Sequence, residues 1–252
     1  MKLLAFDTST ETLSIAVCRP TDSGVQTWEY SGVGGAKAST DLIATILDLL
    51  RQADLPLNTL DAICFGAGPG SFTGLRTACS VAQGLAFGAN VPVLPVDTLL
   101  AVAETARLQM EAPTAPLEVA ALLDARMDEM YAARYAFDGM QWAEQDASHL
   151  VRPHAWVLPA STRSTSVPHG VAGNAFSVYG DRLAAALGNT KYISCLPTAA
   201  AMLRLAPALL GRGLAVTAAE ALPLYIRDKV AKTTAERMAE KAVEKMATKA
   251  AV

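Results

Sequence analysis

A loop with four glycines, placed between an apolar run and a helical pattern, constrains this chain more than any other feature. This glycine loop, Gly66–Arg76, has the sequence GAGPGSFTGLR, follows the apolar run 62–65, and leads into a helical pattern over about 74–87. Glycine permits positive φ and lets another group approach the main chain closely. Ser71 or Thr73 can cap the helix. The order therefore predicts a buried strand, a tight turn and a helix whose free amide groups suit an anion.

The glycine loop does not match the common phosphate-binding motifs. A dinucleotide fingerprint counted from Gly66 needs glycine at position 71, which is serine, and a P-loop needs a lysine that the loop lacks. A tight turn without a ligand is therefore the alternative interpretation. The helix that follows is slim, because most of its apolar residues are small, so one side should face its own sheet and another could face a second protein.

Bulk composition indicates a globular chain. Of the 252 residues, 52% are hydrophobic and 18% are charged, which excludes a disordered protein. No apolar run reaches membrane-spanning length, and no signal peptide is expected. The four cysteines form no CxxC pair, so we expect them to be reduced thiols in a cytoplasmic protein. The net charge of −3 argues against this chain alone holding a nucleic acid.

The pattern of strands and helices occurs twice along the chain. In the first half we expect strands at 3–6, 13–18, 26–30, 61–65 and 91–96, with helices at 39–53 and 74–87. In the second half we expect strands at 118–123, 130–137, 167–172 and 191–196, with helices at 179–187 and 198–210. A proline-bearing segment, 109–116, separates the halves. The predicted domains are 1–108 and 109–227, followed by an Ala/Lys/Glu-rich tail, 228–252, interpreted as a solvated extension.

A polar turn after the first strand is a candidate phosphate site. Asp7, Thr8, Ser9 and Thr10 place hydroxyl and amide groups around one point, and an aspartate there can reach magnesium through water. The alternative is a polar turn whose side chains bond to their own backbone. The three histidines lack metal-ligand spacing, and no serine nucleophile motif occurs, so we predict no metal site and no catalytic residue.

Five motifs occur in an order that resembles one family. They are LLAFDTSTE at 3–11, GPGSFTGLR at 68–76, DARMDEMY at 124–131, GVAGN at 170–174 and PLYIR at 223–227. Together they resemble the bacterial TsaB family, also called YeaZ, from Met1 to about Val230. The GPGSFTGLR run is very specific, and the other four are individually weaker.

The resemblance implies a fold and a set of partners. The implied fold is α/β, an actin/Hsp70/hexokinase-like (ASKHA) duplication of a ribonuclease H-like unit in two lobes. The implied role is in making N6-threonylcarbamoyladenosine on the tRNA adenosine beside the anticodon, as a non-catalytic subunit that activates its sibling TsaD. Implied partners are the TsaD-type catalytic subunit and the TsaE-type ATPase, with a homodimer when the chain is alone, and tRNA reached only through the complex.

At two places this sequence departs from its catalytic relatives, and both departures favour the interpretation that the chain is a degenerate, non-catalytic sibling of TsaD. The region that matches the metal-binding HxxxH helix of the catalytic sibling reads AKASTDLI, at 36–43, with no histidine. The second-lobe turn of kinases with this fold carries Asp-x-Gly, and here Asp124 is followed by Ala125 and Arg126, whose side chains would crowd a phosphate. We therefore expect no cofactor in this chain, with ATP and metal used by its partner subunits.

Candidate site residues fall into two groups beyond the polar turn. The loop and helix start comprise Gly68, Pro69, Gly70, Ser71, Phe72, Thr73, Gly74 and Arg76, and the partner interface is predicted at Leu75, Cys79, Ala82, Gln83 and Ala86. On this assignment Ala82→Glu weakens assembly, unless Ala82 faces its own sheet and the variant unfolds. The alternative functions are an active ASKHA-type phosphotransferase or ATPase and, less favoured, an M22-like peptidase.

Overall fold

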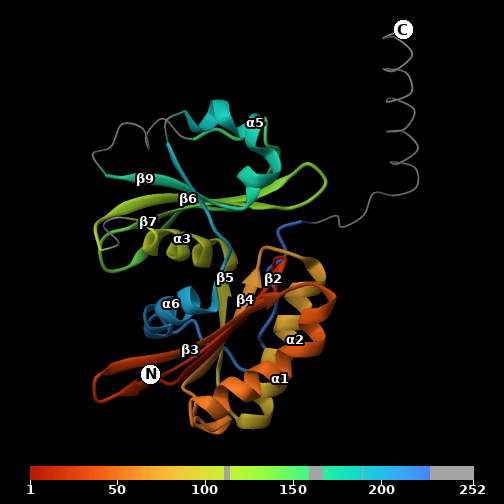
Figure 1. Ribbon diagram of the computed structural model, residues 1–252, viewed down its shortest axis with the longest axis vertical. Helices are drawn as coiled ribbons and strands as arrows, with labels where there is room; N and C mark the ends of the chain where they lie inside the picture. The colour runs from red at the N-terminus through yellow and green to blue at the C-terminus, as the bar shows by residue number, and fades with distance from the viewer. Residues whose placement is uncertain (111–113, 159–166, 189, 228–252) are drawn as a thin grey trace, which may run out of the picture.

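The computed structural model describes residues 1–110, 114–158, 167–188 and 190–227, which form two five-stranded mixed sheets with helices (Figure 1). The elements up to residue 108 are β1 (Leu3–Asp7), β2 (Thr12–Thr21), β3 (Gly24–Val33), α1 (Ala36–Gln52), a short 3-10 helix η1 (Leu57–Thr59), β4 (Ala62–Gly68), α2 (Phe72–Ala89), β5 (Val93–Asp97) and α3 (Thr98–Leu108). Those that follow are β6 (Leu117–Asp124), β7 (Met130–Phe137), β8 (Trp142–Val151), β9 (His169–Gly173), α5 (Ala175–Leu187), β10 (Lys191–Ser194) and α6 (Ala199–Gly211).

The two sheets have the same strand order. The first runs β3-β2-β1-β4-β5 and the second runs β8-β7-β6-β9-β10. In each sheet the first strand along the chain pairs antiparallel with the second and parallel with the fourth. A parallel neighbour requires a crossover, which α1 provides in the first sheet.

Both faces of the first sheet are covered. Leu4 and Phe6 of β1 pack under α1 and α2, whereas Leu3 and Ala5 pack under α6. Because alternate residues of a strand point to opposite faces, a strand buried on both faces is apolar throughout. Figure 1 shows α1 and α2 next to each other on one side of this sheet, with α6 on the other.

Helices α3 and α6 lie between the two sheets and pack against each other (Figure 1). Helix α3 comes early in the chain, yet Leu99, Val102 and Ala106 pack with strands β6, β7 and β9 of the second sheet. Helix α6 comes late, yet Met202 and Leu205 pack against the first sheet. This exchange ties the two halves of the chain together.

Buried polar contacts reinforce the connection between the sheets. The carboxylate of Asp97, at the end of β5, caps α3 by accepting from the N–H of Leu100 (2.9 Å), and also accepts from the hydroxyls of Tyr135 (3.0 Å) and Ser148 (3.2 Å). Burial raises the pKa of this carboxyl. Two strands of the second sheet are thereby fastened to the last strand of the first.

Most predicted elements are present, and three elements were not predicted: α3, β8 and the short helix η1. Helix α3 lacks a polar face because it is buried on both sides, and the exposed edge strand β8 lacks apolar alternation. Helix α5 begins four residues earlier than the predicted 179–187. The tail 228–252 and part of the 109–116 boundary lie outside the described residues, and the domain limits stay predictions. No helix in the described ranges has the length and apolar content that crossing a bilayer requires.

Candidate functional site

The glycine loop lies directly against the turn that joins β1 and β2. The N–H of Ser71 donates to the carbonyl oxygen of Ser9 (2.7 Å), and the hydroxyl of Thr8 donates to the carbonyl oxygen of Gly74 (2.7 Å). A Cβ atom added at Gly74 would overlap the carbonyl oxygen of Thr8, and one added at Gly70 would lie 2.6 Å from that of Ser9. Glycine is required at both positions because the turn occupies the space of a side chain.

The predicted phosphate-binding turn uses its polar groups within the chain. Asp7, Thr8 and Ser9 are at most 3% exposed. Oδ1 of Asp7 accepts from the N–H (2.9 Å) and the hydroxyl (2.7 Å) of Ser9, and the hydroxyl of Thr10 lies 3.2 Å from that of Thr12. Phosphate binding by this turn stays a prediction, and the hydroxyls of Thr8 and Ser9 already have acceptors inside the protein.

The second oxygen of Asp7, Oδ2, is buried without a hydrogen-bond partner among the described residues. It occupies the space that a side chain at Gly66 would need. Burial raises the pKa of Asp7 to about 6, outweighing the two hydrogen bonds from Ser9, which lower it. An ionised Asp7 is therefore a destabilising group at the centre of the contact.

Of the two predicted caps, Ser71 and Thr73, the structure uses Ser71, and α2 begins at Phe72, two residues before the predicted start. Oγ of Ser71 accepts from the N–H of Gly74 (3.4 Å). The first residue of the helix, Phe72, is 37% exposed, and the guanidinium of Arg76 lies over its ring, 3.9 Å from the centroid. The start of α2 thus presents an aromatic ring and a cation together at the surface.

A C-terminal strap, residues 221–227, crosses the glycine loop. The N–H of Leu224 donates to the carbonyl oxygen of Ala67 (2.7 Å), and Nε2 of Gln83 donates to the carbonyl oxygen of Ala221 (2.9 Å). Sequence reasoning quoted the strap only as a motif, PLYIR, and assigned it no role. Because the motif lies about 150 residues after the glycine loop, no local pattern in the sequence indicates that the two segments touch.

The strap also completes the aromatic cluster at the start of α2. The ring of Tyr225 lies 5.5 Å from that of Phe72, and its hydroxyl accepts from Nε of Arg76 (3.0 Å). Two residues further, Nη2 of Arg227 donates to Glu129 Oε2 (2.8 Å) in the turn between β6 and β7. The strap therefore connects the glycine loop to the second sheet.

The turn between β6 and β7 is strained. Its left-handed residues are Arg126 (φ 61°), Met127 (φ 55°) and Asp128 (φ 61°). Each such non-glycine residue costs roughly 1–3 kcal/mol and persists only when its surroundings fix it. Fixing groups include Arg227, which donates to the carbonyl oxygen of Ala125 (2.9 Å). The turn is held firmly by the end of the strap.

The aspartate of this second turn is likewise occupied within the chain. Oδ1 of Asp124 accepts from the hydroxyl of Tyr179 (2.6 Å) and from the N–H of Arg126 (2.9 Å). Neighbouring Asn174 donates from its side chain toward Glu11 (3.5 Å), in the turn between β1 and β2 of the first sheet. Asp7 and Asp124 thus each accept hydrogen bonds from groups of their own chain.

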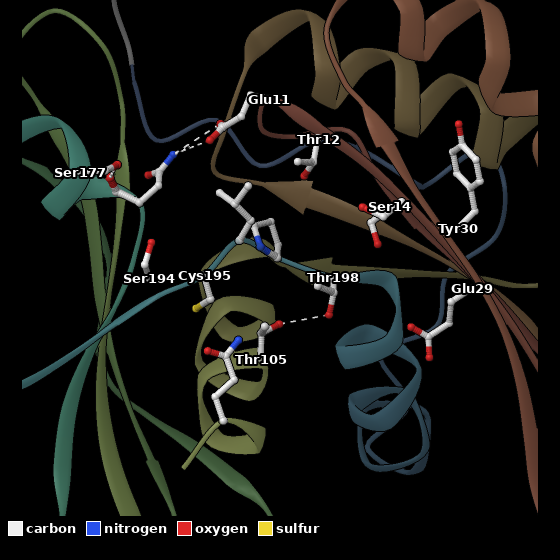
Figure 2. Close-up of a pocket in the computed structure, with 15 residues that line it drawn as sticks. Glu11, Thr12, Ser14, Glu29, Tyr30, Thr105, Ser177, Ser194, Cys195 and Thr198 are labelled. Atoms are coloured by element: carbon white, nitrogen blue, oxygen red, sulfur yellow. Dashed lines mark hydrogen bonds between the residues drawn. The ribbon is translucent and has the colours of Figure 1, made fainter.

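A pocket of about 650 Å³ lies between the two sheets (Figure 2). Hydroxyl groups line much of it, including those of Thr105 and Thr198, which lie 3.1 Å apart. Its charged lining residues, among those described, are the carboxylates Glu11 and Glu29, with neither lysine nor arginine. Such a lining attracts cations and repels phosphates. Within the described ranges, no three His, Cys, Asp or Glu side chains gather to hold a metal ion.

The predicted partner interface requires a correction. Leu75, Cys79, Ala82 and Ala86 are at most 5% exposed and pack inside the chain, because this side of α2 covers the first sheet. Gln83 is turned toward the strap. Ala82→Glu would therefore unfold the chain rather than test a partner contact. Any partner of α2 must use its opposite side.

Fold and site together define a duplicated α/β protein, with one strand order used twice and a glycine loop closed by the first turn. Comparison with known proteins identifies the group. The model of the family TsaD, tRNA N6-adenosine threonylcarbamoyltransferase, matches residues 35–251. The tRNA threonylcarbamoyladenosine biosynthesis protein TsaB of Haemophilus influenzae is 31% identical over 238 residues, covering 91% of this chain and 95% of that protein.

A solved structure agrees with this match. YeaZ from Pseudomonas aeruginosa is 33% identical, with a TM-score of 0.76, over 89% of this chain and 99% of that one. A shorter match, 40% identical over 75 residues, covers 28% of this chain and 22% of the tRNA N6-adenosine threonylcarbamoyltransferase of Nitrosomonas eutropha. The chain belongs to the TsaB (YeaZ) family, and its role lies in the biosynthesis of threonylcarbamoyladenosine in tRNA.

Substitution of Gly74 tests the close contact. Gly74→Ala should lower the free energy of unfolding by roughly 1–3 kcal/mol, because the added methyl group overlaps the Thr8 carbonyl oxygen. The matched control is Gly84→Ala on the same helix, where open space surrounds the new Cβ and stability should rise by up to about 1 kcal/mol. Urea denaturation measures both. Equal effects of the two variants would contradict the argument.

Asp7 should make stability depend on pH. Its pKa is raised from 3.8 to about 6, so the folded protein binds this proton more tightly than the unfolded chain does. The free energy of unfolding should therefore fall as pH rises from about 4 to 6, by on the order of 2–3 kcal/mol, and stay level above. Asp7→Asn should remove this decrease and stabilise the protein at pH 7.5. Asp22→Asn, at an exposed position, is the control. If Asp7→Asn were less stable than wild type at pH 7.5, the predicted direction of the effect of Asp7 on stability would be wrong.

Proposed function

We propose that this chain is a non-catalytic docking subunit that binds and activates the TsaD-type catalytic subunit of the tRNA threonylcarbamoyltransferase complex. The observation that carries the proposal is the outer side of α2. Ser80, Gly84, Phe87 and Gly88 are exposed there, and among the described residues a Cβ built at Gly84 or Gly88 meets nothing within 4 Å apart from the adjacent main chain of its own helix. A glycine inside a helix costs about 1 kcal/mol relative to alanine. Close approach of another helix would account for both glycines.

Large apolar side chains flank this stripe. Phe87 is 84% exposed, and on the adjacent α1 Ile43 and Leu47 are 47% and 51% exposed. We name the outer sides of α1 and α2 the docking face. Small residues allow close backbone approach, and exposed apolar side chains gain most when a partner covers them. The docking face fits a pair of helices from a related subunit or from a second copy of this chain.

The repeated strand order supports the ASKHA assignment, with two ribonuclease H-like lobes. A non-catalytic role is supported by the two turns that hold phosphates in active members of that fold class. Here Asp7 bonds to Ser9, and Asp124 bonds to Tyr179 and Arg126. The carboxylate-lined pocket also disfavours the phosphates of ATP, which weakens the case for a phosphotransferase.

The rest of the assembly follows from the family. We place the chain in the cytoplasm, as a homodimer through the docking face when the catalytic subunit is absent. A TsaE-type ATPase joins the complex, and tRNA is reached only there. ATP and metal belong to the partner subunits, and this chain holds no cofactor of its own. The metal-ligand helix of the catalytic sibling has no histidine counterpart at 36–43 of this sequence.

Reconstitution of the reaction tests the role. Threonylcarbamoylation of tRNA is measured with the catalytic subunit and its ATPase partner, with and without this chain, and with this chain alone. Product should form only when this chain joins the catalytic subunit. Full activity without this chain would overturn the docking role, and activity from this chain alone would overturn its non-catalytic status.

The substitution Gly84→Leu tests the docking face directly. The bulky side chain has room in the isolated chain, so the melting temperature should not fall, but it would separate two packed helices. Affinity for the catalytic subunit should drop by at least about tenfold, or roughly 1.4 kcal/mol. Gly211→Leu on α6 is the matched control, because it is also helical, exposed and surrounded by open space. Unchanged affinity of a folded Gly84→Leu would remove α2 from the interface.

A further inference from the structure

We infer that the strap and Arg76 form a second contact for the catalytic subunit, built to receive a carboxylate flanked by apolar side chains. The inference rests on the proposed docking function and extends it beyond the helices. We name this surface the strap patch; it comprises Phe72, Arg76, Leu222, Leu224 and Tyr225.

Arg76 is held in place but retains donor capacity. Its guanidinium carbon lies 3.9 Å from the centroid of the Phe72 ring and 6.0 Å from that of the Tyr225 ring, and its Nε donates to the Tyr225 hydroxyl (3.0 Å). Its Nη atoms have no partner among the described residues, although a guanidinium carries five N–H donors. A fixed guanidinium with free Nη groups matches the two oxygens of a carboxylate at little entropic cost.

The surroundings of Arg76 have the composition of an interface core. The exposed fractions are 37% for Phe72, 67% for Leu222, 42% for Leu224 and 45% for Tyr225. Aromatic residues and arginine dominate the energetically important positions of protein interfaces, where covering them excludes water. These side chains are held on a strap whose main chain is bonded to the glycine loop, so a partner need not order it.

The strap patch is continuous with the docking face. Arg76 lies on the outer side of α2, four residues before Ser80 and eight before Gly84, so the three residues follow one stripe of the helix. A subunit that packs along α2 would reach the strap at the first turn of the helix. This continuity identifies the catalytic subunit as the occupant.

Charge favours a single carboxylate over RNA. Three arginines around the turn between β6 and β7 are paired: Arg126 with Asp124, Arg182 of α5 with Asp128, and Arg227 at the end of the strap with Glu129. A nucleic-acid surface needs a cluster of unpaired cations. Arg76 supplies one, which suits one carboxylate in an apolar setting.

Charge reversal and apolar truncation test the strap patch on the full chain. The dissociation constant for the catalytic subunit is measured by calorimetry for wild type, Arg76→Glu, Leu222→Ser and Gly84→Leu. Arg212→Glu, an exposed arginine at the end of α6, is the control. Arg76→Glu should weaken binding by about tenfold or more and Leu222→Ser by roughly threefold, since central charged and apolar contacts contribute most. Raising the salt concentration should weaken wild type more than Arg76→Glu.

The outcomes separate this inference from the docking role. If Gly84→Leu loses affinity while Arg76→Glu and Leu222→Ser keep it, the strap patch is refuted and the docking role stands. If wild type itself does not bind, both fail. Weakened binding of tRNA by Arg76→Glu, with unchanged affinity for the catalytic subunit, would also overturn the inference. Leu222→Ser keeps the test valid should Arg76→Glu unfold, because Leu222 is mostly exposed.

Discussion

The contact between the glycine loop and the turn after β1 is the constraint on which the rest of this structure depends. Main chain lies against main chain there, with Gly70 and Gly74 leaving no room for a side chain beside Ser9 and Thr8. Two hydrogen bonds across the contact fix where α2 begins. Because the start of a helix and its first buried residues set its rotation, this contact also decides which side of α2 faces solvent.

The strand, turn and helix around the glycine loop could be predicted from sequence because each of these elements is determined by residues close together in the chain. The rotation of α2 could not. Its residues are small on every side, so the apolar pattern does not distinguish Ala82, which is buried, from Gly84, which is exposed. The predicted interface residues were therefore taken from the buried side of α2. The space around each glycine differs between the two sides of α2, and that space is set by the tertiary fold rather than by the local sequence.

Contacts between distant segments were equally hidden from sequence. Nothing local to Asp97 indicates that its partners are Tyr135 and Ser148, and nothing in α6 indicates that it covers the first sheet. The repeated order of strands was visible as a pattern, since periodicity is a local property. The exchange of α3 and α6 between the sheets was not, because it depends on which surfaces remain to be covered after the sheets form.

Two different physical reasons explain why glycine occupies particular positions of α2. Gly74 is required by the chain itself, since the Thr8 carbonyl oxygen fills the space of its side chain. Gly84 and Gly88 have open space and reduce the stability of their own helix. A sequence selected only for the stability of the isolated chain would carry alanine at positions 84 and 88. If a partner binds the folded chain at this stripe, binding shifts the folding equilibrium toward the folded state. The stability that matters is then that of the complex, and the cost of the two glycines is offset by the closer approach that they allow.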